Sequence, residues 1–175
     1  MQFRPKQTVN AILANLLSMK TGWKQPLRKR EIKMSRIQQT FAALDGAKAL
    51  IPYNPVADPD LDTTLALMHS LVENGADILE LGVPFSDPMA DGPTIQRATV
   101  AALERGTHLE DLFHAVDELT SYGISTCSMT YWNPVEWWGV ERFARDFAAV
   151  GGSGLITPDL PPEEGAQWEA ASDKY

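Results

Sequence analysis

Hydrophobic residues along the chain follow two alternating patterns from residue 36 onward. Apolar positions three or four residues apart, the spacing of an amphipathic helix, occur in 36–44, 61–75 and 140–151. Short apolar runs, which predict strands, begin the segment 49–59 and occupy 77–83, 125–131 and 154–161. The alternation predicts four consecutive units in which a strand is followed by a helix.

Turn and capping residues predict further helix boundaries. Pro93 stands where proline costs no hydrogen bond, so a helix is expected to begin there and to end at Gly106. Thr107 and Glu110 have the spacing of a capping box, which predicts another helix after them. Residues 162–171 are expected to begin the helix of the fourth unit.

Strands that are separated by helices of this length run parallel, because the crossover returns the chain to the same end of the sheet. Each predicted strand leads into a loop that is rich in Pro, Asp, Asn or Tyr. The carboxyl ends of parallel strands are where α/β proteins place their chemistry. The pattern therefore predicts an α/β fold with its functional residues in these loops.

The net charge of −8 conceals two parts of opposite sign. Residues 1–33 hold eight Lys or Arg residues and one acid, whereas residues 34–175 carry a net charge of −15. We interpret 1–33 as a basic extension that is disordered or results from a miscalled start ahead of Met34, with a targeting peptide or a polyanion-binding arm as alternatives. The acidic body should repel nucleic acid and anionic membranes.

Other classes of protein are disfavoured by what the sequence lacks. No apolar run reaches the roughly 20 residues of a membrane span. Cys127 is the only cysteine, so no internal disulfide is possible, and a cytoplasmic location is expected. The three histidines form no metal-ligand cluster, and no metal is expected. Loop packing or stacking on a ligand or partner is open for Trp132, Trp137 and Trp138.

The stretch "LELGVPFSDPMADGP" at 79–93 places a carboxylate inside an apolar strand. Glu80 shares its face with Ile78, and a parallel strand is covered on both faces, so Glu80 is expected to be buried. Burial alone leaves two interpretations open, a structural ion pair or a general acid/base with a raised pKa. Asp87 and Asp91 follow in a loop stiffened by prolines, where turn or capping roles are the simpler alternative.

"LELGVPFSDPMADGPTIQ" closely resembles the signature of the tryptophan synthase alpha chain. "NPVADPD", "SMTYWNP" and "GLITPDLPPEE", at the ends of the other three predicted strands, support the resemblance, which covers about 34–174. It implies a (β/α)8 TIM barrel of which about the first four βα units are present. It also implies a lyase of tryptophan biosynthesis that splits indole-3-glycerol phosphate, by retro-aldol cleavage, into indole and glyceraldehyde 3-phosphate.

The resemblance implies that Glu80 and Asp91 are the two catalytic carboxylates. Glu80 would protonate indole C3 and remove the proton of the side-chain hydroxyl, while ionised Asp91 would accept the indole N–H. Tyr53 and Met129 match apolar positions that flank the indole ring, with ordinary barrel packing as the alternative for each.

The same resemblance implies a partner, the beta chain of an alpha2-beta2 tetramer, which holds pyridoxal phosphate; no cofactor is expected in this chain. The residues that match the interface with that partner are Asp87, Pro88, Asn133, Pro134 and Asp159, with Asn133 and Pro134 expected in a loop.

This sequence departs from the family in its length: a full barrel needs about 250 residues, and the sequence has 175. The phosphate-binding loops expected after strands seven and eight are absent from the 175 residues. We therefore expect residues 34–175 alone to be inactive, and dimeric or aggregated through their open sheet edges. A free-standing indole-3-glycerol-phosphate lyase and a non-catalytic half-barrel that binds a partner stay open as alternatives.

Overall fold

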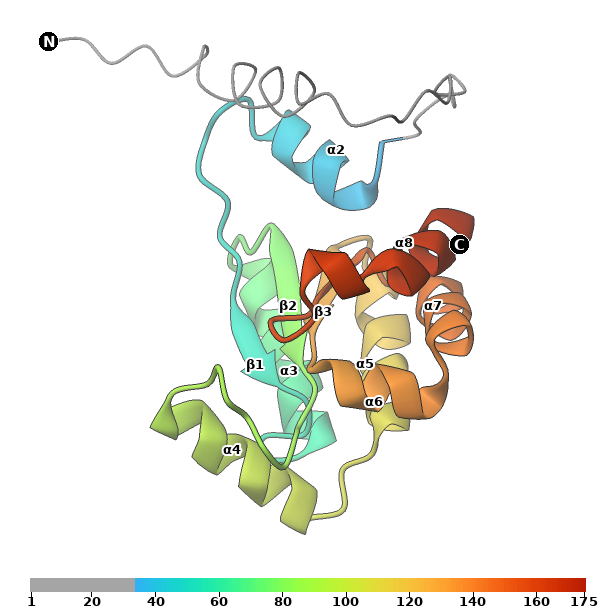
Figure 1. The fold of residues 1–175 in the computed structure, drawn as a ribbon. Coiled ribbons are helices and arrows are strands. Elements are labelled where there is room, and N and C mark those ends of the chain that lie inside the picture. The colour runs from blue at the N-terminus through green and yellow to red at the C-terminus, as the bar shows by residue number, and fades with distance from the viewer. Residues whose placement is uncertain (1–33) are drawn as a thin grey trace, which may run out of the picture. The chain divides into compact units, whose positions relative to one another are not determined.

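The computed structural model of the protein describes residues 34–175, so the interpretation of residues 1–33 lies outside the described residues. Four strands form one parallel sheet in the order β1-β2-β3-β4 (Figure 1). They are β1 (Tyr53–Pro55), β2 (Ile78–Gly82), β3 (Ser125–Met129) and β4 (Gly154–Ile156). Within the described residues β1 and β4 each pair with one neighbour, which leaves two open edges, as the sequence predicted.

Helices connect the strands and end the described chain. They are α2 (Arg36–Ala43), α3 (Leu61–Glu73), α4 (Pro93–Glu104), α5 (Leu109–Ser121), α6 (Trp132–Trp138), α7 (Val140–Ala149), the short 3-10 helix η1 (Pro162–Glu164) and α8 (Ala166–Lys174). The predicted alternation of strands and helices is confirmed, and so are the starts of α3 and α4. Pro93 is the first residue of α4, where its missing N–H leaves no hydrogen bond unmade.

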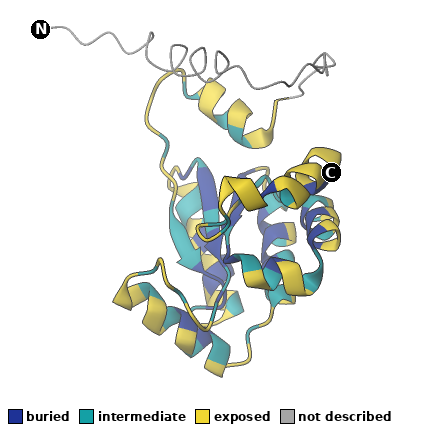
Figure 2. Ribbon diagram, in the orientation of Figure 1, coloured by how far each residue is buried: buried dark blue, intermediate teal, exposed yellow. Residues whose placement is uncertain are grey.

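One face of the sheet carries the hydrophobic core. Leu79 and Leu81 of β2 belong to a buried cluster that includes Leu112 of α5 and Phe143 of α7. Burial accordingly concentrates in the central strands β2 and β3 and on the sides of α5 and α7 that turn inward (Figure 2). Ile78 and Glu80 lie outside this cluster, which confirms the alternation predicted for β2.

The α2 helix contacts the end of the sheet that lies opposite the β2–α4 loop. Thr40 of α2 and Ser125, the first residue of β3, join their hydroxyl groups at 3.1 Å. Arg36 of the same helix donates to the backbone carbonyl of Gly151, just before β4. The α2 helix therefore lies at the amino ends of the strands, away from the loops in which chemistry is expected.

The strand boundaries differ most from the predicted ones at β1 and β4. Residues 49–52 precede β1, which begins at Tyr53, and β4 ends at Ile156 although the sequence predicted a strand to 161. The chain turns at Pro158 and Asp159. This turn lets the Asp159 carboxylate accept the backbone N–H of Trp132 at 2.9 and 3.0 Å.

The α6 helix was not predicted, so the expectation of a loop at Asn133 and Pro134 is wrong. Both residues lie in the first turn of α6, where backbone N–H groups have no partner within the helix and a proline is tolerated. Asp159 satisfies the first of these groups and places a negative charge at the helix amino terminus. The capping acid lies 27 residues further along the chain, which is why no local signal revealed the helix.

The capping box of α5 is displaced by one residue from the predicted pair. His108 donates its backbone N–H to the Asp111 carboxylate at 2.8 Å, in place of the expected Thr107 and Glu110. Thr107 instead donates its hydroxyl to the carbonyl of Ala102 at 2.8 Å, at the end of α4. Thr107 thus completes the helix before it rather than beginning the helix after it.

Candidate functional site

A row of three side chains crosses the sheet on the face opposite the core. Tyr53 of β1 is the register partner of Glu80, and Glu80 is the register partner of Cys127 of β3. Paired residues of neighbouring parallel strands lie side by side about 4.8 Å apart and point to the same face. The phenol, the carboxylate and the thiol therefore stand next to one another near the carboxyl ends of the strands.

Glu80 is only half-buried, so the expectation of full burial is wrong. The described helices α5 and α7 pack their apolar side chains against the other face, the one that carries Leu79 and Leu81. Desolvation still raises the pKa of the Glu80 carboxyl above its usual range. Within residues 34–175 no ion pair or hydrogen bond engages this carboxylate, so the structural ion pair that the sequence left open is not formed.

Tyr53 leans along the same face toward the last residue of β2. A Cβ atom built on Gly82 would overlap the Tyr53 hydroxyl and ring, so only glycine leaves room for this side chain. Burial, followed by the charges of Asp91 and Glu80, raises the pKa of the Tyr53 phenol. The phenol therefore stays protonated and shares its surroundings with both predicted carboxylates.

Cys127 is buried and is not an activated nucleophile. Burial and the neighbouring charge of Glu80 raise the pKa of its thiol to about 11, and the thiol group contacts the carbonyl of Leu79 at 3.4 Å. A thiol with a pKa this high carries almost no thiolate at neutral pH. The burial of Cys127 and its contact with Leu79 fit a structural thiol.

The loop between β2 and α4 brings Asp91 to the same end of the sheet. Gln96 of α4 donates its side-chain amide to the backbone carbonyls of Asp91 and Pro88, at 2.9 and 3.3 Å. The Tyr131 hydroxyl donates to the Asp91 carboxylate at 3.3 Å. Asp91 is therefore held from two sides and is partly exposed to solvent.

Sequence reasoning did not single out Tyr131. This residue follows β3 and reaches a loop 40 positions earlier in the chain, so no local spacing reveals the contact. The only sequence signal was its place in "SMTYWNP", directly after a strand. Met129, the predicted ring-flanking residue two positions before it, is half-buried at the carboxyl end of β3, where it pairs with Gly82.

The predicted partner-binding residues lie in the loops and first turns that follow the strands. Asp87 and Asn133 are exposed, and Pro88 and Pro134 are partly exposed. Asp87 accepts the hydroxyl of Ser86 at 2.6 Å. Asp159 is exposed, but its carboxylate is already used as the cap of α6.

The tryptophans near this end differ in their environment. Trp132 and Trp138 pack against the core, and Trp138 donates its indole N–H to Asp146 at 3.1 Å. Trp137 is 82% exposed. Packing therefore accounts for two of the three tryptophans, and Trp137 lies on the surface of α6.

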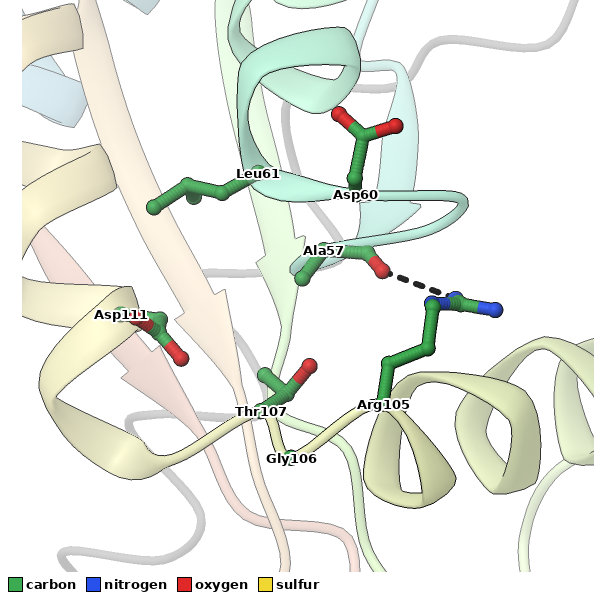
Figure 3. Close-up of a pocket in the computed structure, with 7 residues that line it drawn as sticks. All are labelled: Ala57, Asp60, Leu61, Arg105, Gly106, Thr107 and Asp111. Carbon is green, nitrogen blue, oxygen red and sulfur yellow. Dashed lines mark hydrogen bonds between the residues drawn. The ribbon is translucent and has the colours of Figure 1, made fainter.

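A surface pocket lies beside this loop end, between the start of α3 and the turn from α4 to α5 (Figure 3). Arg105 donates to the carbonyl of Ala57 at 3.0 Å and lies 3.6 Å from the Asp58 carboxylate. Asp60 caps α3 by accepting the backbone N–H of Thr63 at 2.7 Å. The polar groups of this pocket are thus used to fasten the β1–α3 loop and to end helices.

Residues 34–175 offer neither a metal-binding cluster nor a membrane-spanning helix. No group of three His, Cys, Asp or Glu side chains among the described residues is arranged to hold a metal ion. None of the helices in the same part of the chain is long and apolar enough to cross a membrane.

Comparisons with known proteins agree on one family. The family model of the tryptophan synthase alpha chain matches residues 41–174. The chain is 56% identical over 127 residues to the tryptophan synthase alpha chain of Mycobacterium marinum, which covers 73% of this chain and 47% of that protein. It is 54% identical over 144 residues to the tryptophan synthase alpha chain of Leifsonia xyli, and this match covers 81% of this chain and 55% of that protein.

Solved structures give the same result. Tryptophan synthase from M. tuberculosis, in an open form with BRD0059 bound, superposes with a TM-score of 0.79 at 50% identity, covering 81% of this chain and 58% of that one. Tryptophan synthase subunit alpha from Legionella pneumophila superposes with a TM-score of 0.78 at 41% identity, and the match covers 81% of this chain and 56% of that one.

The chain spans about half the length of the curated relatives that it matches. Its four parallel βα units represent part of the TIM-barrel fold of these proteins. The family model matches most of the chain, and the sequence identity to the Mycobacterium marinum and Leifsonia xyli proteins exceeds 50%, so the chain belongs to the tryptophan synthase alpha chain family.

Proposed function

We propose that this chain belongs to an alpha subunit of tryptophan synthase that cleaves indole-3-glycerol phosphate into indole and glyceraldehyde 3-phosphate. The observation that carries the proposal is the pair of carboxylates, Glu80 and Asp91, at the carboxyl ends of the strands. Glu80 has no partner within residues 34–175, and burial raises the pKa of its carboxyl. A carboxyl group whose pKa is raised in this way holds its proton more tightly than an exposed one, as a general acid requires.

The reaction requires two proton movements and one charge stabilisation. Indole C3 first gains a proton, and its bond to the side chain then breaks as the side-chain hydroxyl loses a proton and becomes the aldehyde. In our proposal Glu80 performs both transfers. Asp91 accepts the indole N–H and stabilises the positive charge that develops on the ring before the bond breaks.

The neighbours of Glu80 suit an aromatic substrate. Tyr53 stands beside Glu80 on β1, and Met129 ends the adjacent strand β3. We propose that these two side chains flank the indole ring. Tyr53 stays neutral because burial and the charges of Asp91 and Glu80 raise the pKa of its phenol.

We further propose that the loops at this end bind a beta chain, in an alpha2-beta2 tetramer whose beta chains hold pyridoxal phosphate. The proposal is supported by the exposure of Asp87 and Asn133 and the partial exposure of Pro88 and Pro134. Asp159 would act indirectly, because its carboxylate fixes the first turn of α6. A cytoplasmic location fits an unpaired cysteine, Cys127, in a reducing compartment.

The test of the proposal is indole release from indole-3-glycerol phosphate by the gene product that contains this chain. We expect release that increases when a beta chain is added, and no release with or without a beta chain would contradict the proposal. Release that no beta chain stimulates would favour a free-standing lyase.

The partner is tested separately by co-purification. Asp87→Lys should weaken binding to the beta chain, because it reverses a charge in the proposed interface. Asp117→Lys makes the same charge change on an exposed residue in the second half of α5 and should leave binding unchanged. Equal binding by both variants would contradict the assignment of Asp87.

A further inference from the structure

The Tyr131 hydroxyl bridges two consecutive residues of the β2–α4 loop. It accepts the backbone N–H of Ala90 at 2.7 Å and donates to the Asp91 carboxylate at 3.3 Å. The side chain that makes this bridge is 2% exposed. A hydrogen bond to a charged group in such a setting is stronger than one between neutral groups.

The aromatic ring of Tyr131 is fixed as well as its hydroxyl. Phe85, in the same loop, stacks on the ring with 4.9 Å between centroids and 25° between planes. Tyr131 itself directly precedes α6, two residues after β3 ends. The ring therefore reaches from the end of β3 to a loop that leaves β2.

We propose that Tyr131 is a positioning residue that holds Asp91 in its working orientation. The proposal rests on the function proposed above for Asp91. The loop of residues 83–92 has no helix or strand of its own, so the Asp91 side chain would otherwise sample several rotamers. The bridge fixes the backbone at Ala90 and the carboxylate at Asp91 with one hydroxyl group.

Tyr131→Phe tests the proposal because it keeps the ring and its stacking on Phe85 and removes only the hydroxyl. Positive charge on the indole nitrogen develops in the transition state, so kcat should fall while KM changes little. A charge-assisted hydrogen bond of this kind predicts a loss of about 10- to 100-fold in kcat. Tyr122→Phe, at an exposed tyrosine that follows α5, is the matched control and should leave kcat unchanged.

A double variant separates positioning from a general structural effect. If Tyr131 acts through Asp91, Tyr131→Phe should lower kcat only slightly further in an Asp91→Asn background. The same fold-loss in both backgrounds would overturn the proposal. So would unchanged kcat in Tyr131→Phe while the parent protein releases indole, a result that leaves the proposed function intact.

Backbone hydrogen exchange at Ala90 tests the bridge without any activity measurement. Tyr131→Phe should speed exchange of the Ala90 amide by about tenfold or more, because its acceptor is gone. Exchange at Ser128, in the centre of β3, should stay unchanged. Unaltered exchange at Ala90 would overturn the inference, whether or not the parent protein cleaves indole-3-glycerol phosphate.

Discussion

The two faces of the four-stranded sheet carry opposite kinds of side chain. Toward α5 and α7, Leu79 and Leu81 join a buried cluster with Phe143, and every member is apolar. On the other face Tyr53, Glu80 and Cys127 stand in one row, and each has a pKa raised by burial. The same strands therefore supply stability with one face and chemistry with the other.

The difference shows how a short strand can serve both purposes. Side chains alternate along β2, so each pair of neighbouring residues contributes one to the core and one to the site. A carboxylate without a partner is unfavourable on either face. It is tolerated on the face where Glu80 keeps part of its contact with water.

The largest expected effect is a loss of turnover on the chemical face, the side of the sheet with Tyr53, Glu80 and Cys127. Glu80→Gln keeps the shape of the side chain and removes its proton chemistry, so turnover should fall about 10²- to 10⁴-fold. KM should change much less, because the loss concerns the transition state. Steady-state indole release measures both, with Glu73→Gln at the exposed end of α3 as the control. More than about a tenth of the parent turnover would mean that the general acid/base is another group.

On the core face, the side of the sheet with Leu79 and Leu81, substitutions should act mainly on the free energy of unfolding. Phe143 is fully buried and contacts the rings of Phe113, Phe147 and Trp168. Phe143→Ala should therefore reduce the free energy of unfolding by about 3–5 kcal/mol through lost contacts and a cavity. Val100→Ala, at an exposed position of α4, should change it by less than about 0.5 kcal/mol. Urea denaturation followed by circular dichroism gives both values, and a similar loss in the two variants would contradict the assignment of the core.

A smaller effect is expected where the chemical face is tightly packed. Gly82→Ala places a methyl group against the Tyr53 ring, so stability should fall by about 1–3 kcal/mol. Adding Tyr53→Ala should recover part of this loss by removing the overlap. Gly92→Ala adds the same group into open space and should cost less than about 1 kcal/mol. No difference between the two glycine variants in thermal unfolding would show that Tyr53 does not occupy this position.

The sequence predicted the parts of the fold that depend on local patterns. The periods of 61–75, 77–83 and 140–151 predicted α3, β2 and α7. The resemblance at 79–93 led to the prediction that Glu80 and Asp91 are the catalytic pair. Contacts between distant segments were not predictable in this way. The α6 helix depends on Asp159, and the support of Asp91 depends on Tyr131.

The exposure of Glu80 was mispredicted for a related reason. Alternation along β2 gives the face on which a side chain lies, but only the full arrangement of helices shows how well that face is covered. Here the described helices cover the face with Leu79 and leave Glu80 half-buried. The raised pKa that the sequence suggested for Glu80 is nevertheless present, because partial burial is enough to cause it.

We infer that the face with Glu80 holds an ionisable carboxyl at a cost in stability. Burial raises the pKa of Glu80, so the folded state holds this proton more tightly than the unfolded state. Below the unfolded-state pKa both states are protonated and nothing is lost. As pH rises through the raised pKa of the folded state, the carboxyl must ionise in an unfavourable setting and stability falls.

The decisive measurement is the free energy of unfolding of the gene product that contains this chain and of its Glu80→Gln variant, between about pH 4 and pH 8. The neutral glutamine avoids the cost of ionisation. We predict that the stability of the variant relative to the parent increases with pH across this range, in the same preparation that has lost turnover. A difference that stays constant with pH, or that favours the parent at pH 8, would contradict the account.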